Sequence, residues 1–332
     1  MTPDEVARRC WHAVAFEPAL DDGPVGATVL GEDVVVARLG GRLLAAPDRC
    51  PHRGARLSGG AVGAAPDGTA CLVCPYHALH LDADGAPVHL PARPDGRLPE
   101  RARVRTLPVE VRHGVVWVCL DADPLGALPD WSAFDVAGRA RFQLGPHRWD
   151  ALASRITENF NDLAHFATVH AATFGDADHA VVPPIELRAG DGVIEHGARM
   201  HQLDRVTLDG AHDAAELSYR YTHVMPFASQ LELRYGPGRT EWIQVAVTPV
   251  TRLDDEAPVS MVLQQDARDF DVDGDLDGWR DFQAEVNEED RRALEAVRPR
   301  RIRPDGADAD EVALGPDAFT TAYRRAWRAL LG

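Results

Sequence analysis

The sequence contains no lysine: all 35 of its basic residues are arginines, and they stand against 52 acidic residues. The resulting formal net charge of −17 makes nucleic acid and anionic membrane surfaces poor candidates for partners. No apolar run approaches the length of a membrane span. The N-terminus lacks the basic, apolar and small-residue order of a signal peptide. We therefore expect a cytoplasmic protein with no nucleic-acid or membrane partner.

Cysteine is also scarce, with five residues in a chain of 332. So few cysteines do not form the disulfide framework of a small secreted domain, and cysteines that lie near histidines indicate metal binding instead. A chain of this length is long enough for two domains and a sizeable core. Hydrophobic residues make up 45% of it, which is ordinary for a globular protein.

The first part of the chain alternates like a β-sheet module. Val34–Leu39 and Leu43–Ala45 flank the turn Gly40-Gly41, which predicts a β-hairpin. Further strands are expected at 89–90, 104–111 and 115–120. After Asp121 the chain becomes spaced by proline and glycine, which is typical of a linker.

Two loops each place one cysteine and one histidine close together. One residue separates Cys50 from His52, and two residues separate Cys74 from His77. Two such loops facing each other can hold a [2Fe–2S] cluster with cysteines on one iron and histidines on the other. Structural zinc is the alternative, because two cysteines and two histidines also bind zinc and Cys71 offers a second Cys-x-x-Cys pairing. The cysteine-then-histidine order of both loops favours the cluster.

The segment Glu158–His170 carries three potential metal-binding side chains in a helix-favouring background. Its apolar residues recur with the period of a buried helix face at Ile156, Phe160, Leu163 and Ala167. Asp162 and His165 are three apart and share a face, whereas His165 and His170 are five apart and point away from each other on a regular helix. Both histidines can hold one metal only if the helix loosens between them, as in a π-type turn. The alternative is a pair of ordinary core histidines.

Strand-like runs fill residues 184–265 and predict one antiparallel sheet. They lie at 192–196, 199–208, 216–224, 230–235, 240–249 and 259–264. A sheet that curls round a long helix suits an apolar substrate. His223, Gln230 and Trp242 are candidates for such a pocket, although pairing across neighbouring strands is the more frequent role for residues of this kind.

Residues 275–298 predict a long helix. Asp290 lies in its apolar stripe with Phe282, Val286 and Leu294. A carboxylate on a buried face needs a partner, and a metal ion is a suitable one, with Glu289 as the nearest alternative ligand by spacing. The solvent side of the helix is expected to carry Glu285, Glu288, Glu289, Arg291 and Glu295.

The loop sequences resemble a known iron–sulfur centre. Cys-Pro-His-Arg-Gly-Ala-Arg-Leu-Ser-Gly-Gly from Cys50, followed by Cys-Pro-Tyr-His from Cys74, is similar to the Rieske centre of Rieske non-haem iron oxygenases. The gap between the loops is longer than usual through the turn-like residues Ala-Ala-Pro-Asp-Gly-Thr, and Ala78-Leu79 replaces the usual Gly-Trp. A longer turn need not move the ligands, whereas loss of the tryptophan could change the surroundings and potential of the cluster.

The run Asn-Phe-Asn-Asp-Leu-Ala-His-x-x-x-x-His from Asn159 resembles the mononuclear-iron segment of the same family, in the form of its monooxygenase and demethylase branch. Glu-Glu-Asp at 288–290, followed by an apolar helix, resembles the family's late carboxylate ligand. Together these resemblances imply that His165, His170 and Asp290 bind a mononuclear Fe(II). The Rieske cluster would be held by Cys50, His52, Cys74 and His77. Asp162 would link the two metal centres through a hydrogen bond to a cluster histidine of a neighbouring subunit, most simply His77, in a ring that is usually a trimer.

The expected architecture is α+β. Residues 1–125 are expected to form an all-β Rieske domain and residues 126–148 a linker. Residues 149–332 would form the catalytic domain, an antiparallel sheet with helices in the helix-grip, START-like arrangement.

The resemblance implies a terminal oxygenase that uses dioxygen and electrons from NAD(P)H to hydroxylate or oxidatively demethylate a small organic substrate, aromatic or otherwise apolar. No glycine-rich dinucleotide fingerprint follows a strand, so a separate reductase, with or without a ferredoxin, must supply the electrons. The alternatives are a cis-dihydroxylating dioxygenase, a Rieske-type electron carrier and a zinc-stabilised binding module with a lipid-type cavity. An electron carrier leaves the long region after the cluster loops unexplained.

Overall fold

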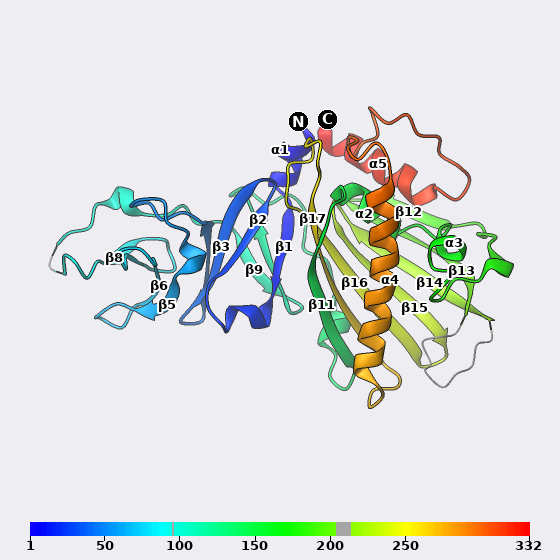
Figure 1. Ribbon diagram of the computed structural model, residues 1–332, viewed down its shortest axis with the longest axis horizontal. Coiled ribbons are helices and arrows are strands. Elements are labelled where there is room, and N and C mark those ends of the chain that lie inside the picture. Colours follow the sequence, from blue (N-terminus) through cyan, green and yellow to red (C-terminus); the bar gives the residue numbers. More distant parts are fainter. Residues whose placement is uncertain (95, 204–213) are drawn as a thin grey trace. The chain divides into compact units, whose positions relative to one another are not determined.

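The computed structural model of the protein describes residues 1–94, 96–203 and 214–332. The chain divides into two compact units, one of Arg8–Leu125 and one that joins Met1–Ala7 to Gly126–Gly332. The first unit is built of strands and short turns, and the second of one large sheet with helices, which confirms the predicted α+β class (Figure 1). No helix in the described part is both long and apolar enough to cross a membrane.

Three small antiparallel sheets make up the unit Arg8–Leu125. They contain β1 (Trp11–Phe16), β10 (Val115–Cys119) and β9 (Val109–Arg112); β2 (Val25–Val29), β3 (Glu32–Leu39) and β4 (Arg42–Pro47); and β5 (Ala61–Ala64), β6 (Ala70–Val73), β7 (His80–Leu81) and β8 (Pro87–His89). The predicted hairpin is β3–β4, and both turn residues, Gly40 and Gly41, have positive φ of 56° and 84°. Two such residues form the turn that suits the twist of a hairpin.

The extra residues between the two cysteine–histidine loops form a hairpin turn. The Ala65 N–H donates to the Thr69 carbonyl at 2.9 Å and the Gly68 N–H to the Ala65 carbonyl at 2.9 Å, so the chain reverses between β5 and β6. Leu72 and Leu81 of these short strands are fully buried in a core that also contains Cys50 and Cys74. The longer gap therefore extends a hairpin and leaves the cysteines in the core.

The second unit contains a seven-stranded antiparallel sheet with the order β11-β17-β16-β15-β14-β13-β12. Its strands are β11 (Ala140–Trp149), β12 (Glu186–Gly190), β13 (Val193–Leu203), β14 (Ala214–Val224), β15 (Ala228–Gly236), β16 (Arg239–Pro249) and β17 (Ser260–Arg268). The runs predicted at 192–196 and 199–208 belong to the one strand β13, because Gly197 stays in register opposite Arg220. The predicted residues 204–208 lie outside the described part.

The segment 126–148 was predicted to be a linker, and that prediction is wrong for its second half, which enters the edge strand β11. The linker was predicted because proline and glycine residues recur in this segment. Gly145-Pro146 lies where the β11–β17 pairing shifts register, and a proline without an N–H is tolerated at a bulge or an edge strand. Phe142 of β11 then packs edge-on against Trp279, with ring centroids 4.6 Å apart.

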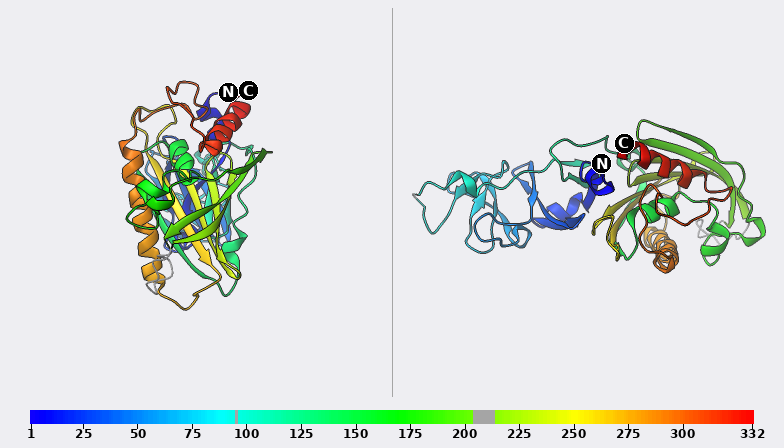
Figure 2. Two further views of the ribbon diagram at one scale, coloured as in Figure 1. Left: turned by 90° about the vertical axis from the view of Figure 1, so that its right-hand side faces the viewer. Right: turned by 90° about the horizontal axis from the view of Figure 1, so that it is seen from above.

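The sheet curves around the helices of this unit, as the view from above shows (Figure 2). The helices are α2 (Ala153–Phe160), α3 (Phe166–Val169), α4 (Leu276–Ala296) and α5 (Ala318–Leu331), with a short α1 (Pro3–Arg8) at the N-terminus. α4 matches the predicted long helix and is capped by Asp275, whose side chain accepts the Gly278 N–H at 2.9 Å. α5 was not predicted, although Phe319, Tyr323 and Trp327 recur at steps of four and are buried.

Candidate metal centres and substrate pocket

The two cysteine–histidine loops share one backbone pattern. The Cys50 N–H donates to the Ala55 carbonyl at 2.8 Å, and the Cys50 carbonyl accepts the Gly54 N–H at 2.9 Å. In the second loop, Cys74 makes the same two bonds with Leu79 and Ala78 at 2.9 and 3.0 Å. Each cysteine therefore begins an equivalent tight loop that carries the following histidine towards the surface.

The four side chains of these loops divide into two pairs. The His52 and His77 ring centroids lie 4.6 Å apart, and the Cys50 and Cys74 thiols are close neighbours inside the core. In the described part of the chain, no three of these four donors gather within 4.8 Å of one another. Donors around one tetrahedral zinc ion would lie at most about 4 Å apart. The arrangement fits a two-iron cluster with a cysteine end and a histidine end, and it does not fit a single zinc ion.

Ala78 occupies the position in the second loop that Gly54 occupies in the first. Both have left-handed backbone conformations, with φ of 53° and 75°. A side chain at such a position crowds the following carbonyl, which is why glycine is favoured there. The neighbouring Leu79, which replaces the family's tryptophan, is 4% exposed and packs in the core with both cysteines. Leucine thus fills a buried place beside the cluster loop, while Ala78 carries backbone strain.

The segment Glu158–His170 is not one loosened helix, as had been expected, but two helices with a turn between them. α2 ends at Phe160, and α3 runs for a single turn, with His165 just before it and His170 just after it. Asp162 stabilises the intervening turn, because its side chain accepts the Ala164 N–H at 2.9 Å. In place of the predicted π-type turn, the two histidines flank this single helical turn. His170 leaves the helical conformation where α3 ends, with φ of −95° and ψ of 22°, and so can face the same point as His165.

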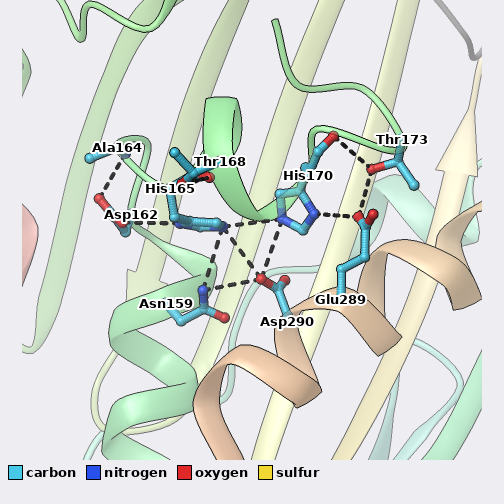
Figure 3. A network of polar contacts seen from close by, with 9 residues as sticks. All are labelled: Asn159, Asp162, Ala164, His165, Thr168, His170, Thr173, Glu289 and Asp290. Atoms are coloured by element: carbon cyan, nitrogen blue, oxygen red, sulfur yellow. Dashed lines mark hydrogen bonds and ion pairs between the residues drawn. The ribbon is translucent and has the colours of Figure 1, made fainter. Parts of the chain in front are cut away.

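His165, His170 and Asp290 meet at that point, although Asp290 comes from α4 (Figure 3). The two Nε2 atoms are 3.1 Å apart, and Asp290 Oδ1 lies 3.4 Å from His165 Nε2 and 3.3 Å from His170 Nε2. Donor atoms about 2.1 Å from one ion, at angles near 90 to 110°, would be about 3.0 to 3.4 Å apart. The observed separations therefore fit a single bound metal ion.

The electrostatics of the trio favour a cation. Burial alone would raise the pKa of Asp290, but His165 and His170 outweigh it and hold that pKa well below its usual range. Burial alone would lower the pKa of His165, but Asp162 and Asp290 outweigh it and raise that pKa to about 9. Without a metal the site therefore attracts a proton, and a divalent ion can take the place of that charge.

Each histidine is oriented by a carboxylate on its far side (Figure 3). Asp162 Oδ2 lies 3.0 Å from His165 Nδ1, and Glu289 Oε2 lies 2.8 Å from His170 Nδ1. Because a carboxylate accepts, both rings carry a proton on Nδ1 and turn the Nε2 lone pair to the shared point. Glu289, predicted to face solvent, instead faces His170, because position 289 lies one step from buried Asp290 at the edge of the apolar stripe.

A pocket opens directly beside the trio. Its lining is mostly aromatic and aliphatic. The residues beyond the trio that line it are Asn159, Phe160, Phe166, Phe174, Gln202, Tyr219, Tyr221, Leu231, Leu233, Tyr235, Ile243, Gln264, Phe282, Gln283, Val286 and Asn287. Asn159 also donates to Asp290 Oδ1 at 3.1 Å, so the pocket and the trio share one wall.

The three residues suggested for the pocket from sequence do not line it. His223 is fully buried against Ser229 at 2.8 Å, Gln230 bonds Gln244 across strands at 2.7 Å, and Arg139 stacks on Trp242 at 3.7 Å. Cross-strand or core pairing is thus their role. The carboxamides that do line the pocket carried no sequence signal, because strand alternation does not say which face of the sheet meets the helices.

One chain thus carries a pair of iron–sulfur loops and, beside an apolar pocket, a trio of two histidines and one carboxylate. This combination defines the oxygenase component of a Rieske-type system. Family models agree with both parts. Residues 10–108 match the Rieske [2Fe–2S] domain, and residues 149–332 match the C-terminal domain of vanillate O-demethylase oxygenase. The second match excludes a simple electron carrier.

Sequence similarity to known proteins extends over nearly the whole chain. Methylxanthine N3-demethylase NdmB from Pseudomonas putida is 30% identical over 96% of this chain and 88% of its own length. Methylxanthine N1-demethylase NdmA from the same organism is 31% identical over 98% of this chain and 90% of its own length. The solved structure of NdmB superimposes with a TM-score of 0.83 at 28% identity, covering 97% of this chain and 90% of that one.

The chain belongs to the Rieske non-haem iron oxygenases. It is therefore an oxidoreductase that carries a Rieske [2Fe–2S] cluster and a mononuclear iron, and uses dioxygen with electrons from a reductase to act on a small molecule. Several of its relatives are demethylases, including NdmA, NdmB and dicamba O-demethylase from Stenotrophomonas maltophilia, which is 29% identical over 92% of this chain and 94% of its own length. They do not favour the dihydroxylating alternative.

Proposed function

We propose that this protein is the terminal oxygenase of a system that removes a methyl group from a nitrogen or oxygen atom of a small organic substrate. The observation that carries the proposal is the meeting of three donor atoms 3.1 to 3.4 Å apart at the wall of an apolar pocket. The demethylase relatives support the reaction type.

The proposal assigns the mononuclear iron to His165, His170 and Asp290. The [2Fe–2S] cluster is assigned to Cys50, His52, Cys74 and His77. When bound, the iron would supply a site for activating dioxygen, and the cluster would supply electrons. The protein's own part is to orient the histidine rings through Asp162 and Glu289, and to hold the substrate's methyl group in a pocket shielded by aromatic side chains.

The overall reaction balances with two electrons and two protons per dioxygen. One oxygen atom enters a C–H bond of the methyl group, and the other leaves as water. The resulting hydroxymethyl group loses formaldehyde as its carbon–heteroatom bond breaks, and the heteroatom keeps a hydrogen. Hydroxylation of a carbon-bound methyl group would stop at the alcohol.

Asp162 is the candidate for passing electrons to the iron site. Its side chain bonds His165 on one side and is 28% exposed, so it can also reach a group of another subunit. The proposal includes a homotrimer in which that group is a cluster histidine, most simply His77, of the neighbouring chain. It also includes a separate reductase, with or without a ferredoxin, and a cytoplasmic location where NAD(P)H is available.

The test is a screen of N-methyl and O-methyl compounds with the iron-loaded protein and a surrogate reductase. We expect oxygen-dependent formaldehyde in step with the demethylated product, and three irons per chain. Formaldehyde is the readout because uncoupled turnover also consumes NADH. A cis-diol in place of formaldehyde would establish the dihydroxylating alternative. Asp162→Asn should keep all the iron and lose nearly all turnover, and full coupled activity in that variant would refute the bridging role.

A further inference from the structure

The polar wall of the pocket is a chain of carboxamides that ends on a buried acid. We call Asn287, Gln264 and Gln283 the carboxamide wall. Asn287 Nδ2 lies 2.8 Å from Gln264 Oε1, and Gln264 Nε2 lies 3.3 Å from Gln283 Oε1. Gln283 Nε2 lies 3.1 Å from Oε1 of Glu241, which is completely buried. All three wall residues line the pocket.

Glu241 determines which end of each carboxamide donates and which accepts in this series of hydrogen bonds. Trp279 Nε1 donates to Glu241 Oε1 at 2.9 Å, and the Tyr235 hydroxyl lies 2.8 Å from Oε2. An indole N–H only donates, so Oε1 must accept. Oε1 accepts whether Glu241 is ionised or protonated. In the protonated acid, the carboxyl proton would lie on Oε2 and would be donated to the Tyr235 hydroxyl oxygen. Gln283 must therefore turn its amino group towards Glu241 and its carbonyl oxygen towards Gln264.

The orientation of Gln283 in turn fixes the donor and acceptor ends of Gln264 and Asn287. Gln264 turns its amino group towards the Gln283 carbonyl oxygen and towards buried Asp266, whose two oxygens lie 3.0 and 3.1 Å away. The Gln264 carbonyl oxygen is left to accept from Asn287 Nδ2. Asn287 has used its amino group in this way. Its Oδ1 is therefore the acceptor available to a molecule in the pocket, with no partner among the described residues.

The charge of the pocket adds a second restriction. No arginine is among the described lining residues, and Asp290 contributes a carboxylate. The nearby Arg268 is 1% exposed, is paired with Asp271 at 3.0 Å, and is stacked over the Trp279 ring at 4.2 Å. Apart from the metal ion itself, the described lining offers an anionic substrate no cation to pair with, and burying an unpaired charge is unfavourable.

We propose that Asn287, oriented by Glu241 through Gln283 and Gln264, selects neutral substrates that present an N–H or O–H donor. This inference rests on the proposed demethylase function and names its substrate class. Asn287 and Asp290 are three residues apart on α4, so they share a face and lie about 5 to 6 Å apart at their Cβ atoms. A small planar ring can span that distance, with its donor at Asn287 and its methyl group at the metal.

The experiment measures equilibrium binding of two matched probe pairs to the iron-loaded protein by calorimetry, with no reductase present. Theobromine has a ring N–H that caffeine replaces with N–CH3, and 2-methoxyphenol has an O–H that 1,2-dimethoxybenzene replaces with O–CH3. We expect the donor member of at least one pair to bind about tenfold more tightly, which is the effect of one hydrogen bond. The 2-methoxybenzoate anion should not bind.

Three variants test the carboxamide wall. Asn287→Leu should bring the ratio of the two dissociation constants close to one. Glu241→Met should lower the ratio from a distance, because Gln283 is then free to turn. Glu241→Gln should restore it, because the new amide oxygen can accept the Trp279 N–H. Glu285→Gln, on the exposed side of α4, is the matched control and should keep the ratio.

Equal binding of both members of each pair, binding of no neutral probe, or an unchanged ratio in Asn287→Leu would overturn the inference. Binding needs neither electrons nor dioxygen, so its outcome is separate from that of the formaldehyde assay. A donor preference without any formaldehyde would leave the selection intact and refute demethylation. Formaldehyde production without a donor preference would support demethylation and refute the selection by Asn287.

Discussion

Removal of the carboxylate behind His170 should weaken metal binding without touching a ligand. Glu289 Oε2 lies 2.8 Å from His170 Nδ1 and 2.7 Å from the Thr173 hydroxyl, so it holds both the tautomer and the rotation of the ring. In Glu289→Ala the ring loses its acceptor. The Nδ1 proton can then move to Nε2, where it would occupy the lone pair that the metal needs.

The expected loss follows from the usual effect of such outer partners, about 10- to 100-fold in metal affinity, or about 1.4 to 2.8 kcal/mol. Glu289→Gln should lose less, because its amide oxygen, in the place of Oε2, can still accept from both His170 Nδ1 and the Thr173 hydroxyl. The affinity should therefore fall in the order glutamate, glutamine, alanine.

The assay is an anaerobic Fe(II) titration against a competing chelator, after removal of the mononuclear iron with the cluster left in place. The visible spectrum of the cluster reports that the protein remains folded. Glu288→Ala is the matched control, because Glu288 pairs with Arg291 and Arg292 on the solvent side at 2.7 and 2.8 Å. If Glu289→Ala and Glu288→Ala bind iron equally well, the carboxylate does not position His170.

Three further predictions concern stability, each measured as a free energy of unfolding in urea. Ala78→Gly should stabilise the protein by about 0.5 to 1 kcal/mol, because glycine relieves the left-handed φ of 53°. No gain would mean that the loop is not strained there. Arg324→Met should cost about 3 kcal/mol, because Arg324 holds the nearly buried Glu158 at 2.7 and 3.0 Å; a neutral effect would show that the pair is dispensable. Burial lowers the pKa of His196 from 6.5 to about 4, so the unfolded chain takes up its proton first and stability is lost as the pH falls from about 6.5 towards 4. The free energy of unfolding should fall by about 2 kcal/mol less between pH 7 and pH 5 in His196→Asn than in the unmodified protein. His147→Asn, at an exposed position, should leave this pH dependence unchanged. The same pH dependence in His196→Asn and in the unmodified protein would contradict a buried neutral ring.

The chemistry-bearing residues were predictable from the sequence where short-range geometry determines them. A cysteine and a histidine two or three residues apart must lie on one loop, and the i, i+4 period of α4 placed Asp290 on a buried face before any fold was known. The long antiparallel sheet followed from strand alternation in the same way. A departure from a regular helix between His165 and His170 was predicted, because two histidines five residues apart on a regular helix cannot face one metal. Its form, a one-turn α3 that ends just before His170, was not predicted.

Other features depended on contacts between residues far apart in the chain. The prolines before position 149 indicated a linker, but pairing with β17 makes that stretch a strand, because a bulge accommodates Pro146 at the sheet edge. Glu289 seemed one of several surface acids until His170, 119 residues earlier, was placed opposite it. The sequence by itself determined the class of metal chemistry, because metal-ligand patterns are local. Only the tertiary structure decided which carboxamide oxygen faces the substrate, because Glu241, Gln264 and Asn287 come from β16, β17 and α4 and their hydrogen bonds exist only once these elements pack.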